Sequence, residues 1–240
     1  MKRNIYLAVI WCITAVCILV GIVIHAGGGF FALRDKLFSL SGIAGAVSGT
    51  GSGNSDTADV ELSGAFHRID IDAGVAEIEI RHGSDFGVSL RKDGIQSTCR
   101  IVDDTLKVSQ EENVMSLTGE NERKLTLLIT TPDDIDSMET DLGVGSIRLD
   151  GVRFGNVDMD LGVGNIDSCD CDYNLLDIDC GTGDINISGL TNPETAYSFD
   201  IDSFAAITVL GSLYSTECER GSGANIIQID CGVGNVVINE

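Results

Sequence analysis

The sequence is poor in proline, aromatic side chains and basic residues. Its 240 residues include 2 Pro, 3 His and 5% aromatics, and 15 Lys and Arg oppose 37 Asp and Glu, giving a formal net charge of -22. Binding of nucleic acid requires clustered Lys and Arg, so this charge argues against nucleic acid as a partner. All three histidines precede position 83, so no Ser/His/Asp or Cys/His catalytic set can be assembled. Glycine is abundant, at 29 residues, but lacks the three-residue period of collagen.

An uncharged run of twenty residues, Ile5 to Ile24, lies near the N-terminus. At about 1.5 Å per residue, a helix of this length spans the hydrocarbon core of a bilayer. Residues 1–26 are therefore predicted to form a transmembrane anchor. A cleaved signal peptide is the alternative, but its apolar region is usually shorter, and Ile24-His25-Ala26 is a poor cleavage site.

Lys2 and Arg3 before the anchor favour a cytoplasmic N-terminus. We therefore expect a single-pass protein of the cell membrane with an extracytoplasmic ectodomain. Residues 27–57 are rich in Gly and Ser at both ends and predict a flexible linker. Within them, FFALRDKLFSL is either a short amphipathic helix on the membrane surface or an extension of the anchor.

The ectodomain, residues 58–240, contains an internal repeat. Copies of the pattern Asp-x-Gly-x-Gly begin at Asp141, Asp160, Asp179 and Asp230, and more degenerate copies begin at Asp72 and Asp202. The first three regular copies are 19 residues apart, and self-similarity at this length is typical of a solenoid.

Apolar and polar residues alternate around each copy, which is the period of a half-buried strand. When the copies are stacked, similar residues lie above one another and form columns that point inward. One column contains Thr140, Met159, Ile178, Ile201 and Ile229, and the next contains Leu142, Leu161, Cys180, Ser203 and Cys231. The ectodomain is therefore predicted to be all-β, a single-stranded parallel β-solenoid (β-helix). A less regular lead-in would cover residues 58–132, and regular coils of about 19 residues would cover 133–240.

Residues 59–240 resemble the bacterial putative-adhesin family, a domain of unknown function. The resemblance rests on later D-x-G-x-G-[DNS]-I coils, a strand ending at Pro132, and a lead-in F-x-x-I-x-I-x-x-G-x-x-x-I-x-I formed by Phe66, Ile69, Ile71, Gly74, Ile78 and Ile80. It implies a β-solenoid of the cell envelope, often behind one transmembrane helix and without established enzymatic activity. It also implies an association with envelope-stress or regulator operons. The copy at Asp202 departs from the pattern, because Phe204 and Ala206 replace both glycines, so we expect a different turn there.

Stacking also predicts two outward columns of carboxylates. Asp141, Asp160, Asp179, Asp202 and Asp230 form one, and Glu139, Asp158, Asp177 and Asp200 form the other. Carboxylates about 5 Å apart repel each other, and calcium would relieve that repulsion. The candidate cation ligands are Asp158, Asp160, Asp177 and Asp179.

An alternative reading of these aspartates involves no metal, no cofactor and no catalytic residue. Each Asp would then accept backbone N–H groups of its own Gly-x-Gly turn. The absence of the G-G-x-G-x-D spacing of calcium-binding solenoids favours this alternative.

Two of the 8 cysteines, Cys12 and Cys17, lie in the predicted anchor, and six lie in the ectodomain. If the coils stack in sequence order, Cys180 and Cys231 are two coils apart, about 10 Å, which is too far for a disulfide. Cys169-Asp170-Cys171 lacks zinc-site spacing. We therefore expect buried free thiols. Sequence-order stacking also leaves the last coil, near Val236–Ile238, exposed for end-to-end self-association unless it is capped.

These patterns favour a non-catalytic, membrane-anchored module for binding, scaffolding or envelope stress. Its partner would be an unknown envelope protein or glycan. The alternatives are a calcium-dependent adhesin, a polysaccharide-active β-helix enzyme, and a spacer without a ligand. An enzyme would need a groove with two carboxylates in different environments.

Overall fold

The computed structural model describes residues 59–92, 95–110, 124–190, 192 and 194–239. The predicted anchor (1–26) and linker (27–57) lie outside these residues. No helix in the described part of the chain is long and apolar enough to cross a membrane. The described residues form an all-β structure, as the alternating pattern predicts, with sixteen strands and one short 3-10 helix.

The strands of the first half, in chain order, are β1 (Val60–Leu62), β2 (Arg68–His82), β3 (Gly87–Arg91), β4 (Ser97–Val102), β5 (Thr105–Gln110), β6 (Leu125–Thr131), β7 (Ile135–Asp150) and β8 (Arg153–Cys169). The elements of the second half are β9 (Asp172–Thr182), β10 (Ile185–Ser188), η1 (Glu194–Ala196), β11 (Tyr197–Ser203), β12 (Ile207–Val209), β13 (Ser212–Tyr214), β14 (Glu217–Gly221), β15 (Asn225–Val233) and β16 (Val236–Ile238).

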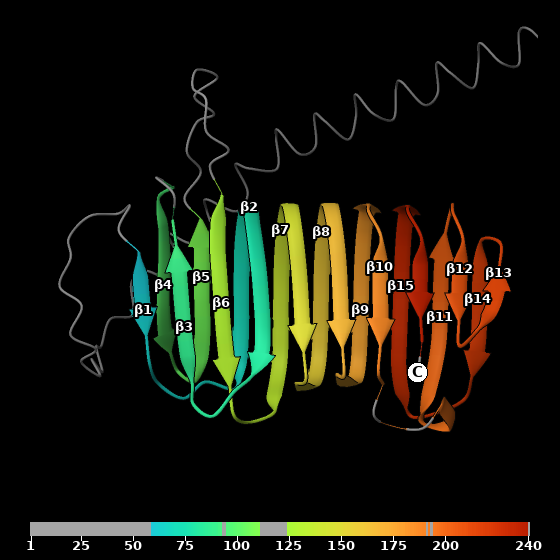
Figure 1. The fold of residues 1–240 in the computed structure, drawn as a ribbon, viewed down its shortest axis with the longest axis horizontal. Coiled ribbons are helices and arrows are strands. Elements are labelled where there is room, and N and C mark those ends of the chain that lie inside the picture. Colours follow the sequence, from blue (N-terminus) through green and yellow to red (C-terminus); the bar gives the residue numbers. More distant parts are fainter. Residues whose placement is uncertain (1–58, 93–94, 111–123, 191, 193, 240) are drawn as a thin grey trace, which may run out of the picture. The chain divides into compact units, whose positions relative to one another are not determined.

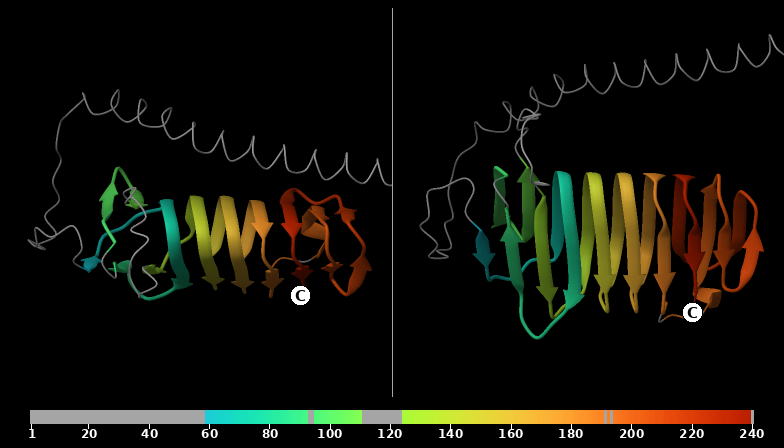
Figure 2. Two further views of the ribbon diagram at one scale, coloured as in Figure 1. Left: turned by 90° about the horizontal axis from the view of Figure 1, so that it is seen from above. Right: turned by 45° about the horizontal axis from the view of Figure 1, so that its top comes forward.

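The strands form two layers (Figures 1 and 2). Each coil passes from one layer to the other at a corner, which in the regular copies is the Gly-x-Gly of the repeat, as where β8 changes its partner from β9 to β10. The first half of β2 pairs in parallel with β5, and its second half pairs in parallel with β6. We call the layer before the corners the first layer and the layer after them the second layer. In the first layer the strands lie in the order β4-β5-β2-β7-β8-β9-β15-β11-β14, and in the second layer in the order β1-β3-β6-β2-β7-β8-β10-β16-β12-β13.

The core lies between the layers and consists of stacked columns of similar side chains. Ile71, Thr140, Met159, Ile178, Ile229 and Ile201 occupy consecutive strands of the first layer in one register. Ile78, Ile147, Ile166, Ile185, Val236 and Ile207 do the same in the second layer. All of these residues are buried. The inward columns expected from the alternating pattern are therefore confirmed.

The corner glycines are required by the close approach of successive coils. A Cβ on Gly162 would lie 2.6 Å from the carbonyl oxygen of Gly143, and one on Gly181 would lie 2.6 Å from that of Gly162. At the second glycine of the motif the approach is closer still, since a Cβ on Gly164 would overlap the carbonyl oxygen of Gly145. No side chain fits there without separating the coils.

The last coil does not lie at the end of the stack, which corrects the expectation of sequence-order stacking. β15 pairs in parallel with both β9 and β11, and β16 pairs in parallel with both β10 and β12. The coil that begins at Asp230 is thus inserted between those that begin at Asp179 and Asp202 (Figure 1). The predicted exposed edge near Val236–Ile238 is therefore wrong, because β16 is paired on both sides.

A glycine-rich crossing makes this insertion sterically feasible. After β14 the chain passes the start of β11, where Gly223 donates its backbone N–H to the carbonyl of Tyr197 over 3.1 Å. A Cβ on Gly221, which has a φ of 84°, would overlap the carbonyl oxygen of Tyr197, and one on Gly223 would overlap Ala196. Gly221-Ser222-Gly223 is a signal for this crossing that the repeat pattern alone does not reveal.

The other end of the stack is reordered in the same way. β5 and β6 follow β2 in the chain but pair with its outer side, while β7 pairs with its inner side. β2 and β7 are paired from Arg68 to Arg81, so regular stacking already begins in the region expected to be an irregular lead-in. Antiparallel strands complete both ends, namely β1, β3 and β4 at one and β13 and β14 at the other. The solenoid is parallel only between them.

The degenerate copy at Asp202 has the different turn that its sequence predicts. The Ser203 hydroxyl donates to the carbonyl of Gly234 over 2.7 Å and accepts the backbone N–H of Ala205 over 3.1 Å. A side chain hydroxyl thus organises the turn that glycines form in the other coils, and Phe204 is left exposed.

We expect Gly164→Ala to lower the free energy of unfolding by about 3 kcal/mol, because its Cβ would overlap the carbonyl of Gly145. The matched control is Gly74→Ala in the first coil, where the nearest atom is 3.5 Å away in the flexible side chain of Gln110. The control should change stability by less than about 0.5 kcal/mol. Urea unfolding measures both values, and equal losses in the two variants would contradict the close-approach argument.

Candidate functional site: an acidic sheet face

Two outward columns of carboxylates run across the first layer. The column at the corner contains Asp72, Asp141, Asp160, Asp179, Asp230 and Asp202, in this spatial order. The second column contains Asp70, Glu139, Asp158, Asp177, Gln228 and Asp200. The membership of both predicted columns is confirmed, but the insertion of β15 changes their order and places Gln228 within the second column.

The four predicted cation ligands lie together at the middle of this face. Asp158 and Asp160 on β8 are the direct register partners of Asp177 and Asp179 on β9. Neighbouring strands are about 4.8 Å apart, so the four carboxylates stand at the corners of a small rectangle. Asp177 is half-buried and the other three are exposed.

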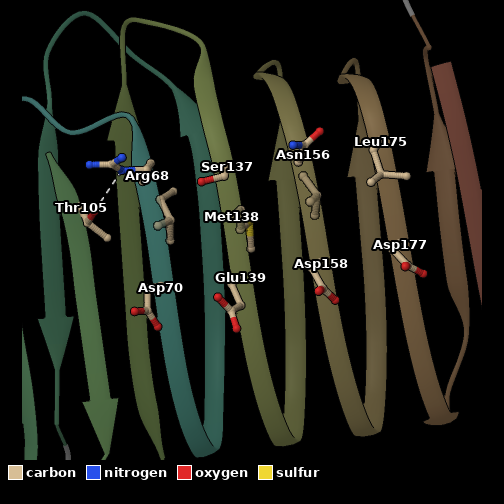
Figure 3. A pocket seen from close by; sticks show the side chains of 12 residues that line it. Arg68, Asp70, Thr105, Ser137, Met138, Glu139, Asn156, Asp158, Leu175 and Asp177 are labelled. Atoms are coloured by element: carbon tan, nitrogen blue, oxygen red, sulfur yellow. Dashed lines mark hydrogen bonds between the residues drawn. The ribbon is translucent and has the colours of Figure 1, made fainter. Parts of the chain in front are cut away.

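A shallow depression of about 350 Å³ follows the second column (Figure 3). Asp70, Glu139, Asp158 and Asp177 lie along one side of it, and Arg68, Ser137, Asn156 and Leu175 lie along the other (Figure 3). The carboxylates come from four consecutive strands and point the same way. The depression is therefore a row of like groups on a sheet surface.

The carboxylates at the centre have no partner, whereas one at the margin does. Among the described residues, Asp158, Asp160, Asp177 and Asp179 make no side-chain hydrogen bond or ion pair. At the margin, Lys107 forms an ion pair of 2.6 Å with Asp70. Repulsion is thus left uncompensated at the middle of the face.

Repulsion and partial burial shift two of these groups. Desolvation, followed by the charges of Asp179, Asp158, Asp141 and Asp177, raises the pKa of Asp160 above its usual value. Desolvation and the charges of Asp158 and Asp179 likewise raise the pKa of Asp177. Both shifts show that the face holds negative charge at an energetic cost.

The side chains that bond to the turns are not these aspartates but the residues just after the second glycine. Asn165 accepts the backbone N–H of Asp184 over 3.0 Å, and Asp184 accepts that of Asn235 over 2.9 Å. Each side chain therefore binds the turn of the next coil. The Asp, Asn or Ser at the end of the motif is the sequence signal for this ladder, in which the leading aspartates Asp160 and Asp179 take no part.

A row of exposed apolar side chains borders the corner column. Val75, Val144, Val163 and Val233 occupy the middle position of the corner motif, in register with Thr182. Their exposed fractions range from 38% to 59%. The acidic face therefore has an apolar margin. Its residues are visible in the repeat as the middle position of the corner motif, but an analysis of charge alone does not reveal them.

Another group of metal-capable side chains lies at the far end of the second layer. Within the described residues, one oxygen of Asp150, one of Asp170 and the sulfur of Cys169 lie within 4.8 Å of one another. None of these is among the four aspartates expected to bind a cation.

The six ectodomain cysteines are free thiols in this structure. Cys171, Cys180, Cys218 and Cys231 are buried, while Cys99 and Cys169 are half-buried. The expected separation of Cys180 and Cys231 by two coils is wrong, because β15 lies beside β9 and the two residues are direct register partners.

Comparisons with known proteins identify one family and structures of similar fold. A model of the Toastrack DUF4097 family matches residues 66–210. A putative cell adhesion protein from Clostridium sporogenes ATCC 15579 is similar in fold, with a TM-score of 0.56 and 11% identity over 76% of this chain and 98% of that one. A putative adhesin from Bacteroides fragilis NCTC 9343 is 16% identical over 75% of this chain and 95% of that one, with a TM-score of 0.30. No curated protein matches the sequence.

The raised pKa values predict that the acidic face destabilises the fold less at mildly acidic pH than at neutral pH. An acid whose pKa is raised by folding ionises at a cost to the native state, and that cost disappears as the pH falls through the raised value. Asp160→Asn should therefore increase stability at pH 7, by less than about 1 kcal/mol because the group is exposed. It should leave stability unchanged below about pH 3, where the native and unfolded aspartate are both largely protonated.

Asp167→Asn is the matched control for this prediction. It removes the same charge from the second layer, and the new amide oxygen can still accept the side-chain N–H of Asn186. Thermal unfolding from about pH 2.5 to pH 8 compares the two variants. Equal pH profiles would mean that net charge, and not the local columns, governs the effect.

Proposed function

We propose that this chain, which belongs to the Toastrack DUF4097 family, is a non-catalytic, adhesion-type binding module that presents its acidic face to a cationic partner. The observation that carries the proposal is the pair of carboxylate columns on one sheet layer, unpartnered at their centre. A structural spacer has no need to concentrate like charges, because each repulsive pair costs stability. A bound cationic surface would lower the repulsion between the carboxylates and so offset this loss of stability.

The proposal places this module outside the cell, held by the anchor of residues 1–26 and the linker of residues 27–57. The uncharged run from Ile5 to Ile24 supports the anchor, and the Gly/Ser composition supports the linker. A coil of about thirty residues has a root-mean-square reach of roughly 30 Å, which leaves the acidic face free to meet a partner near the membrane.

The chemistry of the face favours an envelope protein with a basic patch over a glycan. Uncharged glycans have no charge to complement the columns, and acidic glycans are repelled by them. The valine row beside the corner column adds apolar contact area. A partner surface that combines Lys or Arg with apolar side chains would use both features.

A calcium-dependent adhesin is the second candidate, and the raised pKa values of Asp160 and Asp177 favour it. Desolvation is the largest cause of these shifts, and a divalent cation between β8 and β9 would lower the repulsion that adds to it. A polysaccharide-active enzyme has less support, because the depression is a shallow row of carboxylates that face the same way. Glycoside hydrolysis needs two carboxylates on opposite sides of the scissile bond.

A short lysine peptide tests the cationic-partner proposal. We expect the ectodomain to bind hexalysine at low ionic strength. The double substitution Asp158→Asn/Asp177→Asn should weaken binding at least fivefold. The control Glu79→Gln/Asp167→Asn removes the same number of charges from the second layer and should weaken binding less than twofold. Isothermal titration calorimetry gives the affinities, and equal losses in both variants would show attraction to overall charge without a binding face.

Calcium is tested separately by thermal unfolding after treatment with a chelator. If a calcium ion binds the native state alone, millimolar calcium should raise Tm saturably, and Asp160→Asn should reduce the rise. Magnesium at the same ionic strength is the control. A rise no larger than that with magnesium would remove the calcium-dependent alternative and leave the cationic-partner proposal in place.

A further inference from the structure

The position of the last coil brings together two cysteines that lie about 50 residues apart in the chain. β15 enters between β9 and β11, and Cys231 thereby becomes the direct register partner of Cys180. On the other side of Cys231, the register partner is Ser203. On the other side of Cys180, it is Leu161. The two thiols therefore form an isolated pair within their column.

Both side chains point into the core from adjacent parallel strands. The exposed fractions of Cys180 and Cys231 are 3% and 1%. In-register residues of neighbouring strands have Cα atoms about 4.8 Å apart, which lies within the 4.4–6.8 Å range of disulfide-bonded cysteines. The other described cysteines are on different columns or strands, so neither thiol has a competing partner in its register.

We propose that Cys180 and Cys231 are a disulfide-forming pair that covalently fixes the inserted last coil. The closed loop would contain β10 to β14 and the part of β15 before Cys231, together with the Gly221-Ser222-Gly223 crossing. β15 and β16 follow β14 in the chain. They nevertheless lie between the coil of β9 and β10 and the coil of β11 and β12, which are consecutive in the chain. A bond from Cys231 to Cys180 prevents them from leaving that position.

The chemistry is thiol–disulfide exchange with a small or protein disulfide as oxidant. The thiolate of one cysteine attacks the oxidant's disulfide, forms a mixed disulfide and releases one thiol. The thiolate of the other cysteine then attacks the protein sulfur of the mixed disulfide and releases the second thiol. Each protein thiol loses one proton, and the two electrons reduce the oxidant to two thiols.

Burial determines when this exchange occurs. Desolvation raises the pKa of Cys180 to about 11 and also raises that of Cys231, so both are protonated in the closed coil. Exchange therefore takes place while the last coil is open, during folding or local unfolding, and bond formation then accompanies closure.

The sequence offers a direct assay on the full chain in detergent. The protein is refolded with oxidised and reduced glutathione, free thiols are blocked with N-ethylmaleimide, and the denatured chain is cut with trypsin. No Lys or Arg lies between Arg153 and Arg220 or after Arg220, so Cys180 and Cys231 fall on separate peptides, residues 154–220 and 221–240. We expect mass spectrometry to find these two peptides joined, with fragment ions that assign the bond to Cys180 and Cys231, and separated by dithiothreitol.

Two variants and one physical measurement complete the test. Cys180→Ser should abolish the joined peptide. Cys218→Ser, which replaces another buried cysteine on β14, should retain it. Oxidation should raise Tm by roughly 5–10 °C in the wild type and in Cys218→Ser. Recovery of peptide 221–240 with N-ethylmaleimide on Cys231 would overturn the proposal. So would a bond from Cys231 to Cys169, Cys171 or Cys218 in the wild type, which is read without any variant having to fold.

Discussion

Successive coils approach one another at the corner so closely that the carbonyl oxygen of Gly145 occupies the space that a Cβ on Gly164 would need. The same contact recurs from Gly164 to Gly183 and from Gly183 to Gly234. This contact fixes the register of the coils that contain it, and the register determines which side chains become neighbours. Isoleucines then stack on isoleucines inside, and aspartates stack on aspartates outside. The hydrophobic core and the acidic face are thus two results of one steric constraint.

The acidic face is the part of this arrangement that opposes stability. Repetition of the inward columns stabilises the fold, because each added coil buries more apolar surface. Repetition of the outward columns destabilises it, because each added coil brings another like charge within about 5 Å. The structure compensates this at one margin, where Lys107 pairs with Asp70, and leaves it uncompensated at Asp158, Asp160, Asp177 and Asp179. The cationic partner that we propose would supply positive charge there and lower this repulsion.

The sequence was sufficient to predict the all-β solenoid, the inward columns and the membership of the carboxylate columns, since these follow from alternation and a 19-residue spacing. It was not sufficient to predict coil order. Repetition makes the Asp230 copy compatible with several positions. Its insertion beside β9 is accompanied by the crossing at Gly221 and Gly223, the β12–β13 hairpin and the antiparallel pairing of β14 with β11. That single difference also changed the interpretation of Cys180 and Cys231. The role of Asn165 and Asp184 in binding the turns was missed because the leading aspartates offered an equally local explanation.

The central claim is that the outer face of the first layer is the surface that meets a cationic partner. Amide NMR of the isotope-labelled ectodomain, titrated with hexalysine, tests it most directly because every described backbone N–H outside the prolines reports its own environment. The account predicts that the largest shift changes fall on β7, β8 and β9, at Glu139, Asp141, Asp158, Asp160, Asp177 and Asp179 and their direct neighbours. Changes spread equally over both layers, or concentrated on the second layer, would contradict it.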